Sequence, residues 1–185
     1  MKRILLIAVT LLLAASLAQA QSSTTGTTTL SVAVGPEAAI VVNTATSDLT
    51  SPSIFADYAG TTDLTYRVRT SGTGVGSGTI VLQVTSDFGG PAGGPRVASP
   101  PAGTSLTYTC TDPGPGTACT GSITALTAST TNVSTFGANA YSTIAGTLAT
   151  VVWTLTNSPA YPVATYTATV TFTISAAEFA DGRSG

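Results

Sequence analysis

The side chains that could do chemistry in this chain are mostly carboxylates. Its 185 residues include eight aspartates and glutamates but no histidine, so neither a Ser–His–Asp nor a Cys–His arrangement can form. A glycosidase would need two carboxylates with opposite pKa shifts, and Asp57, Asp63, Asp87 and Asp112 have no surroundings that would produce them. No segment offers the run of oxygen ligands that a calcium site needs. We interpret these residues as turn formers, and predict no enzymatic activity, no metal and no cofactor.

The first 20 residues have the features of a secretory signal peptide. Lys2 and Arg3 precede an apolar run, and an A-x-A cleavage pattern ends at Ala20. The apolar run is too short to span a membrane. We predict that residues 1–20 are removed and that the mature chain starts near Gln21. The product is then secreted, to the extracellular space or the cell surface, with the periplasm as the alternative compartment.

The charged residues of the mature chain argue against two classes of partner. Four arginines would stand against eight acidic residues, which gives a net charge of about −4. Scattered arginines do not form the basic stripe of a nucleic-acid surface, and no second apolar run could span a membrane. Arg67 and Arg69 follow each other on one strand face. We predict surface pairs with Asp63 or Asp57 there, in preference to an anion-binding patch.

Two cysteines, Cys110 and Cys119, are the only ones in the chain. An even number of cysteines in an exported chain favours a disulfide. The residues between them, T-D-P-G-P-G-T-A, are rich in turn formers that can bring the two ends together. A redox or metal pair is the alternative, but two cysteines without histidine cannot close a zinc site, and the spacing is not C-x-x-C.

Residues 165–174 show the clearest structural pattern in the chain, T-Y-T-A-T-V-T-F-T-I. Threonine takes every odd position and an apolar residue or tyrosine every even one, so a β-strand would have one hydroxyl face and one apolar face. Other stretches alternate in the same way. We predict further strands over residues 29–34, 38–44, 63–71, 79–85, 106–111, 121–127, 132–136 and 147–156.

The connections between these strands favour a sandwich. Residues 87–103 contain five glycines and four prolines, which excludes a strand or helix interior. The glycine-rich residues 71–78 predict a hairpin connection, and Phe55 and Tyr58 are predicted to cover the edge of the core. With eight or nine strands and no helix after the signal peptide, we predict an all-β, antiparallel immunoglobulin-like β-sandwich with Greek-key connections. A barrel is the alternative.

The domain organisation follows from these assignments. After the signal peptide, we predict a flexible segment at 21–28, one sandwich domain at 29–176 and a tail at 177–185. The first strand, with Leu30, Val32 and Val34 on one face, can pair within its own domain or add to the edge of a neighbour. The sequence Val34-Gly-Pro36 predicts a short turn, which favours pairing within the domain.

Three late sequence stretches carry a resemblance to known proteins. Trp153-Thr-Leu155, Asn157-Ser-Pro159 and the threonine-rich strand at 165–174 resemble the C-terminal part of secreted bacterial surface domains. The W-x-L triplet is similar to that of WxL-type cell-wall-binding domains, and the last strand is similar to that of fimbrial and spore-coat-type subunits. The resemblance implies a secreted β-sandwich of a bacterial surface.

We therefore expect an exported, non-enzymatic structural or adhesive protein of the bacterial surface, with a fimbrial-type subunit that binds copies of itself by strand addition as one form. The alternative is a binding module for cell-wall or other polysaccharide. Trp153 fits the core better than a sugar-stacking platform, and a solvent-facing row that included Trp153, Tyr141 or Tyr161 would favour the glycan binder. An ice-binding threonine face comes third, because it needs a flat array and sandwich sheets twist.

Overall fold

The structure, a computed structural model, describes residues 25–72 and 77–177 of the chain. The predicted signal peptide lies outside these residues. The chain divides into two units, Met1–Ala33 and Val34–Gly185, and every strand in the described residues belongs to the second. No described helix has the length and apolar character needed to cross a membrane.

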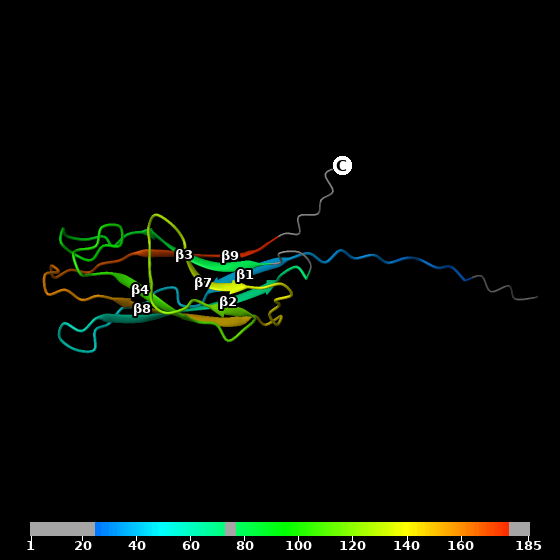
Figure 1. The fold of residues 1–185 in the computed structure, drawn as a ribbon, viewed down its shortest axis with the longest axis horizontal. Coiled ribbons are helices and arrows are strands. Elements are labelled where there is room, and N and C mark those ends of the chain that lie inside the picture. Colours follow the sequence, from blue (N-terminus) through cyan, green and yellow to red (C-terminus); the bar gives the residue numbers. More distant parts are fainter. Residues whose placement is uncertain (1–24, 73–76, 178–185) are drawn as a thin grey trace, which may run out of the picture. The chain divides into compact units, whose positions relative to one another are not determined.

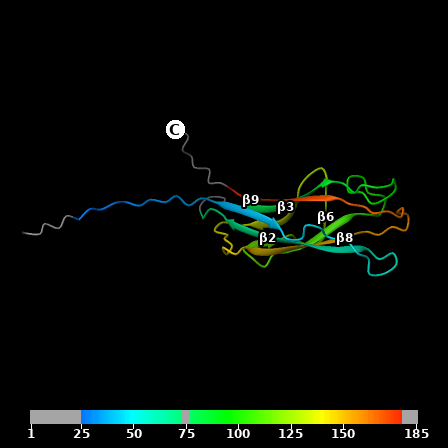
Figure 2. The same ribbon diagram turned by 180° about the vertical axis from the view of Figure 1, so that it is seen from behind.

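Nine described strands form two antiparallel sheets that face each other (Figures 1 and 2). One sheet has five strands in the order β1-β2-β8-β4-β6, and the other has four in the order β5-β7-β3-β9. This arrangement confirms the predicted antiparallel sandwich over the barrel. The strands are β1 (Glu37–Val42), β2 (Tyr58–Arg69), β3 (Gly78–Ser86), β4 (Leu106–Thr111), β5 (Gly116–Ala118), β6 (Ile123–Thr124), β7 (Thr131–Phe136), β8 (Thr147–Leu155) and β9 (Thr169–Ala176).

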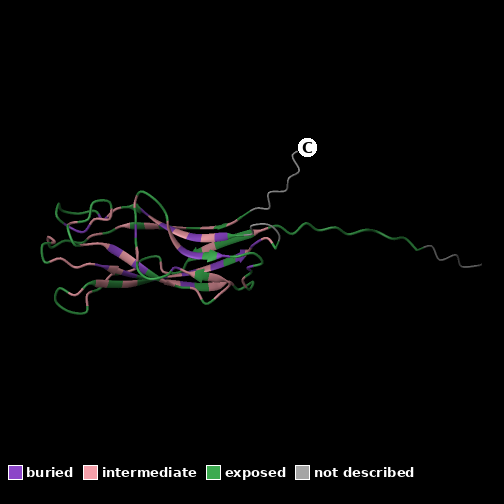
Figure 3. Cartoon of the chain, viewed as in Figure 1, coloured by how far each residue is buried: buried purple, intermediate pink, exposed green. Residues whose placement is uncertain are grey.

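The core lies between the two sheets, where alternate residues of the central strands meet (Figure 3). Each central strand turns every second side chain inward because successive residues point to opposite faces. The pattern of buried residues therefore follows the predicted apolar positions on β2, β3, β4 and β8. The principal core residues are Leu64, Tyr66, Val68, Ile80, Leu82, Val84, Leu106, Tyr108, Val133, Phe136, Ala149, Val151, Trp153 and Leu155.

The strand order is that of an immunoglobulin-like domain. Such domains place strands A, B, E and D in one sheet and C, F and G in the other. Here β1, β2, β8 and β4 take the places of A, B, E and D, while β3 and β9 take those of C and F. β5 and β7 extend the second sheet on the far side of β3. Among the described strands, none lies beside β9 at the place of strand G.

Long connections gather at one end of the sandwich, at the left in Figure 1. They are residues 43–57, 87–105 and 156–168, and hydrogen bonds tie them together. The amide of Asn157 donates to Asp57 Oδ1 over 2.9 Å, and that of Gly89 donates to the Thr167 carbonyl over 3.0 Å. The expectation that residues 87–103 form neither strand nor helix is confirmed.

Several predicted elements differ in the structure. Residues 29–34 form no strand, and the glycine-rich connection at 71–78 is no hairpin, because β2 and β3 belong to different sheets. The predicted strand at 121–127 shortens to β6, and the pairing of β9 begins only at Thr169. Phe55 does not cover the core: its side chain is 62% exposed and its φ is 60°. Tyr58 does pack against the core, half-buried.

Candidate functional site

One edge of the sandwich is open. β9 bonds to β3 and β1 bonds to β2, and neither strand has a second hydrogen-bonded neighbour within the described part of the chain. β1 and β9 lie side by side along this edge, without a ladder of hydrogen bonds between them. Each therefore presents a row of unpaired backbone N–H and C=O groups, which is the usual template for the addition of another strand.

Burial confirms that the sandwich is incomplete along this edge. The inward residues of β3, which lies next to β9, are at most 1% exposed. On β9 the inward residues Val170, Phe172 and Ile174 pack against the core but are only half-buried. On β1, Ile40 is half-buried and Val42 is 42% exposed. Apolar side chains that face the core at this edge thus remain partly in contact with solvent.

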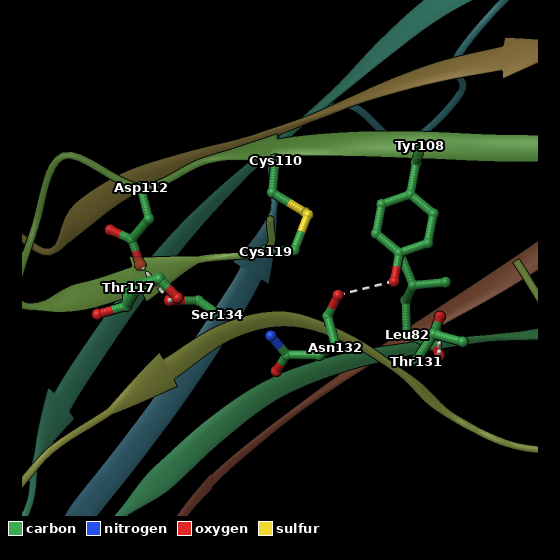
Figure 4. The surroundings of a disulfide bond; sticks show 9 residues. All are labelled: Leu82, Tyr108, Cys110, Asp112, Thr117, Cys119, Thr131, Asn132 and Ser134. Atoms are coloured by element: carbon green, nitrogen blue, oxygen red, sulfur yellow. Dashed lines mark hydrogen bonds between the residues drawn. A yellow bond between two sulfur atoms is a disulfide. The ribbon is translucent and has the colours of Figure 1, made fainter. Parts of the chain in front are cut away.

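The predicted disulfide is present, and it closes the opposite edge of the sandwich. Cys110 on β4 and Cys119 just after β5 form a disulfide, with their Cα atoms 5.4 Å apart. β4 belongs to the five-stranded sheet, whereas β5 is the edge strand of the four-stranded one, so the bond joins the two sheets (Figure 4). β5 itself was missed in the sequence, since its three residues lie within the turn-rich stretch between the cysteines.

Replacing both cysteines by serine should lower the free energy of unfolding by about 2–3 kcal/mol, because the short loop is then unconstrained in the unfolded chain. Denaturant unfolding of the oxidised protein and of the Cys110→Ser/Cys119→Ser variant measures the difference. The reduced wild type is the matched control and should unfold with the variant. Equal stability of all three proteins would contradict the expectation.

A half-buried carboxylate supports this closed edge. Asp112 Oδ1 accepts hydrogen bonds from Tyr66 Oη (2.7 Å) and the Gly114 amide (3.0 Å), and its Oδ2 accepts one from Ser134 Oγ (2.5 Å). Burial raises the pKa of the Tyr66 phenol, and the Asp112 carboxylate raises it further. A Cβ at Gly116 would collide with the Asp112 and Ser134 oxygens. The cluster links the two sheets, and both oxygens of its carboxylate are engaged by these donors.

Asp57 and Asp63, which the sequence also singled out, likewise accept hydrogen bonds from other parts of the fold. Asp63 Oδ1 accepts a hydrogen bond from Thr150 Oγ1 over 2.8 Å, and Asp57 binds the amide of Asn157. They therefore hold separate parts of the fold and do not act as a pair. Among the described residues, no three histidine, cysteine or acidic side chains gather as metal ligands would.

Asp87 organises the long connection at residues 87–105. Its carboxylate accepts hydrogen bonds from the amides of Phe88, Val97 and Ala98, at 2.7–3.0 Å. Burial by itself would raise the pKa of Asp87, but these three hydrogen bonds and the nearby Arg96 guanidinium outweigh it and lower the pKa. The ionised side chain therefore fastens one side of the loop to the other.

The three aromatic residues considered for a sugar-binding row lie in different surroundings. Trp153 is buried, and its Nε1 donates a hydrogen bond to Thr62 Oγ1 over 2.9 Å. Tyr141 is exposed near the end of β2, where it pairs with Arg69, and Tyr161 lies half-buried in the connection at the other end. Of these three residues, only Tyr141 is largely exposed to solvent.

The arginine pairs predicted with Asp63 or Asp57 are wrong. Arg67 instead donates from Nε to the Ile144 carbonyl over 2.7 Å. Arg69 forms an ion pair with Glu37 over 2.9 Å and donates from Nε to the Gly35 carbonyl, also over 2.9 Å. The sequence pattern placed both arginines on an outward face but could not show that a neighbouring strand and loop would supply their partners.

A wide depression of about 560 Å³ lies beside the disulfide, next to Asp112 and Leu148. It is open to solvent, and the carboxylate on its wall is already engaged by Tyr66 and Ser134. The open edge is thus the better candidate for function. No family model, no curated protein and no solved structure matches this chain.

Proposed function

We propose that the protein is an exported, non-enzymatic structural subunit of a bacterial surface, which assembles with copies of itself by strand addition. The added strand is the N-terminal segment, residues 27–34, of a neighbouring copy. The observation that carries this proposal is the free edge of β9, with its half-buried apolar face. An immunoglobulin-like sandwich normally places one further strand there.

The edge needs an occupant with particular properties. A strand that pairs with β9 must turn apolar side chains inward at every second position, to complete the layer begun by Val170, Phe172 and Ile174. It must also be uncharged on that inward face, because an unpaired charge against the core is costly. Its length should match the eight residues of β9.

The N-terminal segment has these properties. Leu30, Val32 and Val34 alternate with small or hydroxyl-bearing residues, and their side chains are 92%, 84% and 65% exposed. The segment contains no charged residue. Its eight residues would extend over about 26 Å, which equals the length of an eight-residue strand. An exposed alternating segment and a free apolar edge therefore occur in the same chain and fit each other.

The proposed location rests on sequence features together with the fold. The signal-peptide pattern at residues 1–20 supports export, and the disulfide is typical of an oxidising compartment. The low charge content, 8% of residues, and the hydroxyl-rich outer face of β9 suit an extracellular β protein. The polysaccharide-binding alternative has no comparable support, because Trp153 is buried.

Sedimentation velocity of the mature chain, starting at Gln21, tests the proposal. Wild type should form multimers whose size grows with protein concentration. The double variant Leu30→Asp/Val32→Asp should remain monomeric, because it would place two charges against the core of the neighbour. The matched control Thr29→Asp/Ser31→Asp carries the same charges on the opposite face of the segment and should still assemble.

Two results would contradict the proposal. A wild-type protein that sediments as a monomer at all accessible concentrations would remove the assembling subunit. Equal loss of assembly in both double variants would show that charge matters and that the apolar face does not. Saturable binding of the monomer to peptidoglycan or a common glucan would then favour the binding module.

A further inference from the structure

A tight turn with two large apolar side chains lies in the connection between β1 and β2. The Ala56 amide donates to the Ser53 carbonyl over 3.2 Å, so residues 53–56 form a four-residue β-turn. Its two central residues are Ile54 and Phe55, whose side chains are 87% and 62% exposed. Figure 1 shows this connection, in cyan, projecting beyond the ends of β2 and β8.

The backbone of Phe55 has an unfavourable conformation. Its φ is 60°, and a positive φ at the third position of a β-turn is normally taken by glycine or asparagine. A bulky residue with such a φ is an outlier, because its side chain crowds the backbone. The conformation costs stability, and strain of this kind persists where it serves a function. A residue chosen only to form the turn would not be phenylalanine.

Hydrogen bonds at the base of the turn hold it in this conformation. Ser51 Oγ lies 2.7 Å from the carbonyl oxygens of both Ser53 and Ala56. Asn157 donates from Nδ2 to the same Ala56 carbonyl over 3.0 Å. Because Asn157 belongs to the connection between β8 and β9, the turn is fixed to a second part of the fold. The two apolar side chains are therefore presented to solvent on a firm support.

The size of the turn favours a lipid surface over a protein partner. A stable protein–protein interface takes roughly 800 Å² from each partner. Two large side chains offer about 300–500 Å² between them, even when they are fully buried. A lipid surface needs no complementary shape, and the gain from each inserted side chain is proportional to its own apolar area. A projecting turn of two residues is thus sufficient for a lipid surface and too small for a protein interface.

The charges of the connection indicate the kind of lipid headgroup. Residues 43–57 contain Asp48 and Asp57 but no lysine or arginine, so they lack the basic side chains that bind anionic lipids. The residues between the two aspartates, L-T-S-P-S-I-F-A, carry no charge, and insertion would therefore not bury one. This combination fits a neutral headgroup such as phosphatidylcholine.

We infer that Ile54 and Phe55 form an anchor that inserts into a neutral lipid surface, and that the strained φ of Phe55 is retained to present it. This activity is separate from the proposed assembly by strand addition. The turn follows the end of β1, whereas the N-terminal segment joins the start of β1 at the opposite end of the sandwich. Failure of one proposal therefore leaves the other standing.

Co-sedimentation of the mature chain with phosphatidylcholine vesicles tests the anchor. Wild type should bind, and added phosphatidylglycerol should not strengthen the binding. Ile54→Ser/Phe55→Ser should lower the lipid partition coefficient at least tenfold, as expected when two apolar side chains no longer leave water. The matched control is Tyr141→Ser/Ile144→Ser, which also removes an aromatic ring and an isoleucine. These two side chains are 74% and 94% exposed before the start of β8, and the control should bind like wild type.

Phe55→Asn distinguishes an anchor from a turn that serves the fold alone. Asparagine tolerates a positive φ, so this variant should unfold at a higher temperature than wild type and yet bind the vesicles more weakly. A lower melting temperature would contradict the strain, and undiminished binding would contradict the anchor.

Three further results would overturn the inference. Wild type could show no binding at any accessible lipid concentration. The two double variants could lose binding equally, which would indicate non-specific adsorption of exposed apolar residues. Finally, Ile54→Ser/Phe55→Ser could form smaller multimers than wild type in sedimentation velocity without lipid, which would assign the turn to a contact between copies of the chain.

Discussion

Replacing Trp153 by alanine should lower the free energy of unfolding by about 3–5 kcal/mol, the range found for large aromatic residues in protein cores. Trp153 lies on β8, the strand between β2 and β4, and is 4% exposed. Its ring packs against Tyr108, with the ring centroids 5.5 Å apart. The variant also leaves the buried Thr62 hydroxyl without its indole donor.

Urea unfolding followed by circular dichroism measures this loss. Val152→Ala is the matched control, because Val152 is the preceding residue on the same strand and points outward. It should change the stability by about 0.5 kcal/mol or less, as most surface substitutions do. A Trp153→Ala protein as stable as Val152→Ala would contradict a core position for Trp153 and would reopen the sugar-stacking interpretation.

Replacing Asp112 by alanine should lower the free energy of unfolding by about 3 kcal/mol, because two fully buried hydroxyl groups each lose their carboxylate acceptor. Those hydroxyls belong to Tyr66 and Ser134, both 0% exposed and on opposite sheets. Asp112→Asn keeps the shape and one acceptor oxygen, so it should lose about half as much. Calorimetric unfolding of the three proteins at pH 7 measures the series, and equal losses in both variants would contradict the proposed network.

The same cluster predicts a dependence on alkaline pH. Since burial and the Asp112 carboxylate raise the pKa of Tyr66 above its unfolded value of 10.0, the neutral phenol is favoured in the folded state. The stability that the neutral Tyr66 phenol contributes is fully present below pH 10 and is lost as the pH rises further. Asp112→Ala should weaken this dependence, because one of the causes that raise the pKa is then absent.

The sequence predicted the core better than the edges. On β2, β3 and β8, strict alternation placed Leu64, Leu82 and Val151 in the core, and the structure confirms all three. The alternation within each strand decides that these side chains face the core, whichever strand lies beside it in the sheet. Residues 29–34 alternate just as clearly and yet form no strand, because periodicity shows that a strand is possible and not that a partner is present.

The candidate site could not be predicted for a related reason. Whether β9 is a central or an edge strand depends on which distant segments pair with it, and here its partner β3 lies more than 80 residues away in the chain. The threonine-rich pattern at 165–174 suits either position. The Arg69 contacts with Gly35 and Glu37 likewise depend on the pairing of β1 with β2. Only the alternating apolar residues of the N-terminal segment were visible in the sequence.

Binding of a synthetic peptide to a truncated domain tests strand addition most directly. All core residues and the residues that pack on them lie at or after Ile40, so a chain that starts at Gly35 should fold without residues 21–34. We expect it to be monomeric and to bind a peptide spanning residues 27–36 saturably, with an increase in melting temperature. The same peptide with Leu30→Asp and Val32→Asp should not bind. A folded truncated domain that shows no binding of the wild-type peptide at any accessible concentration would contradict the account.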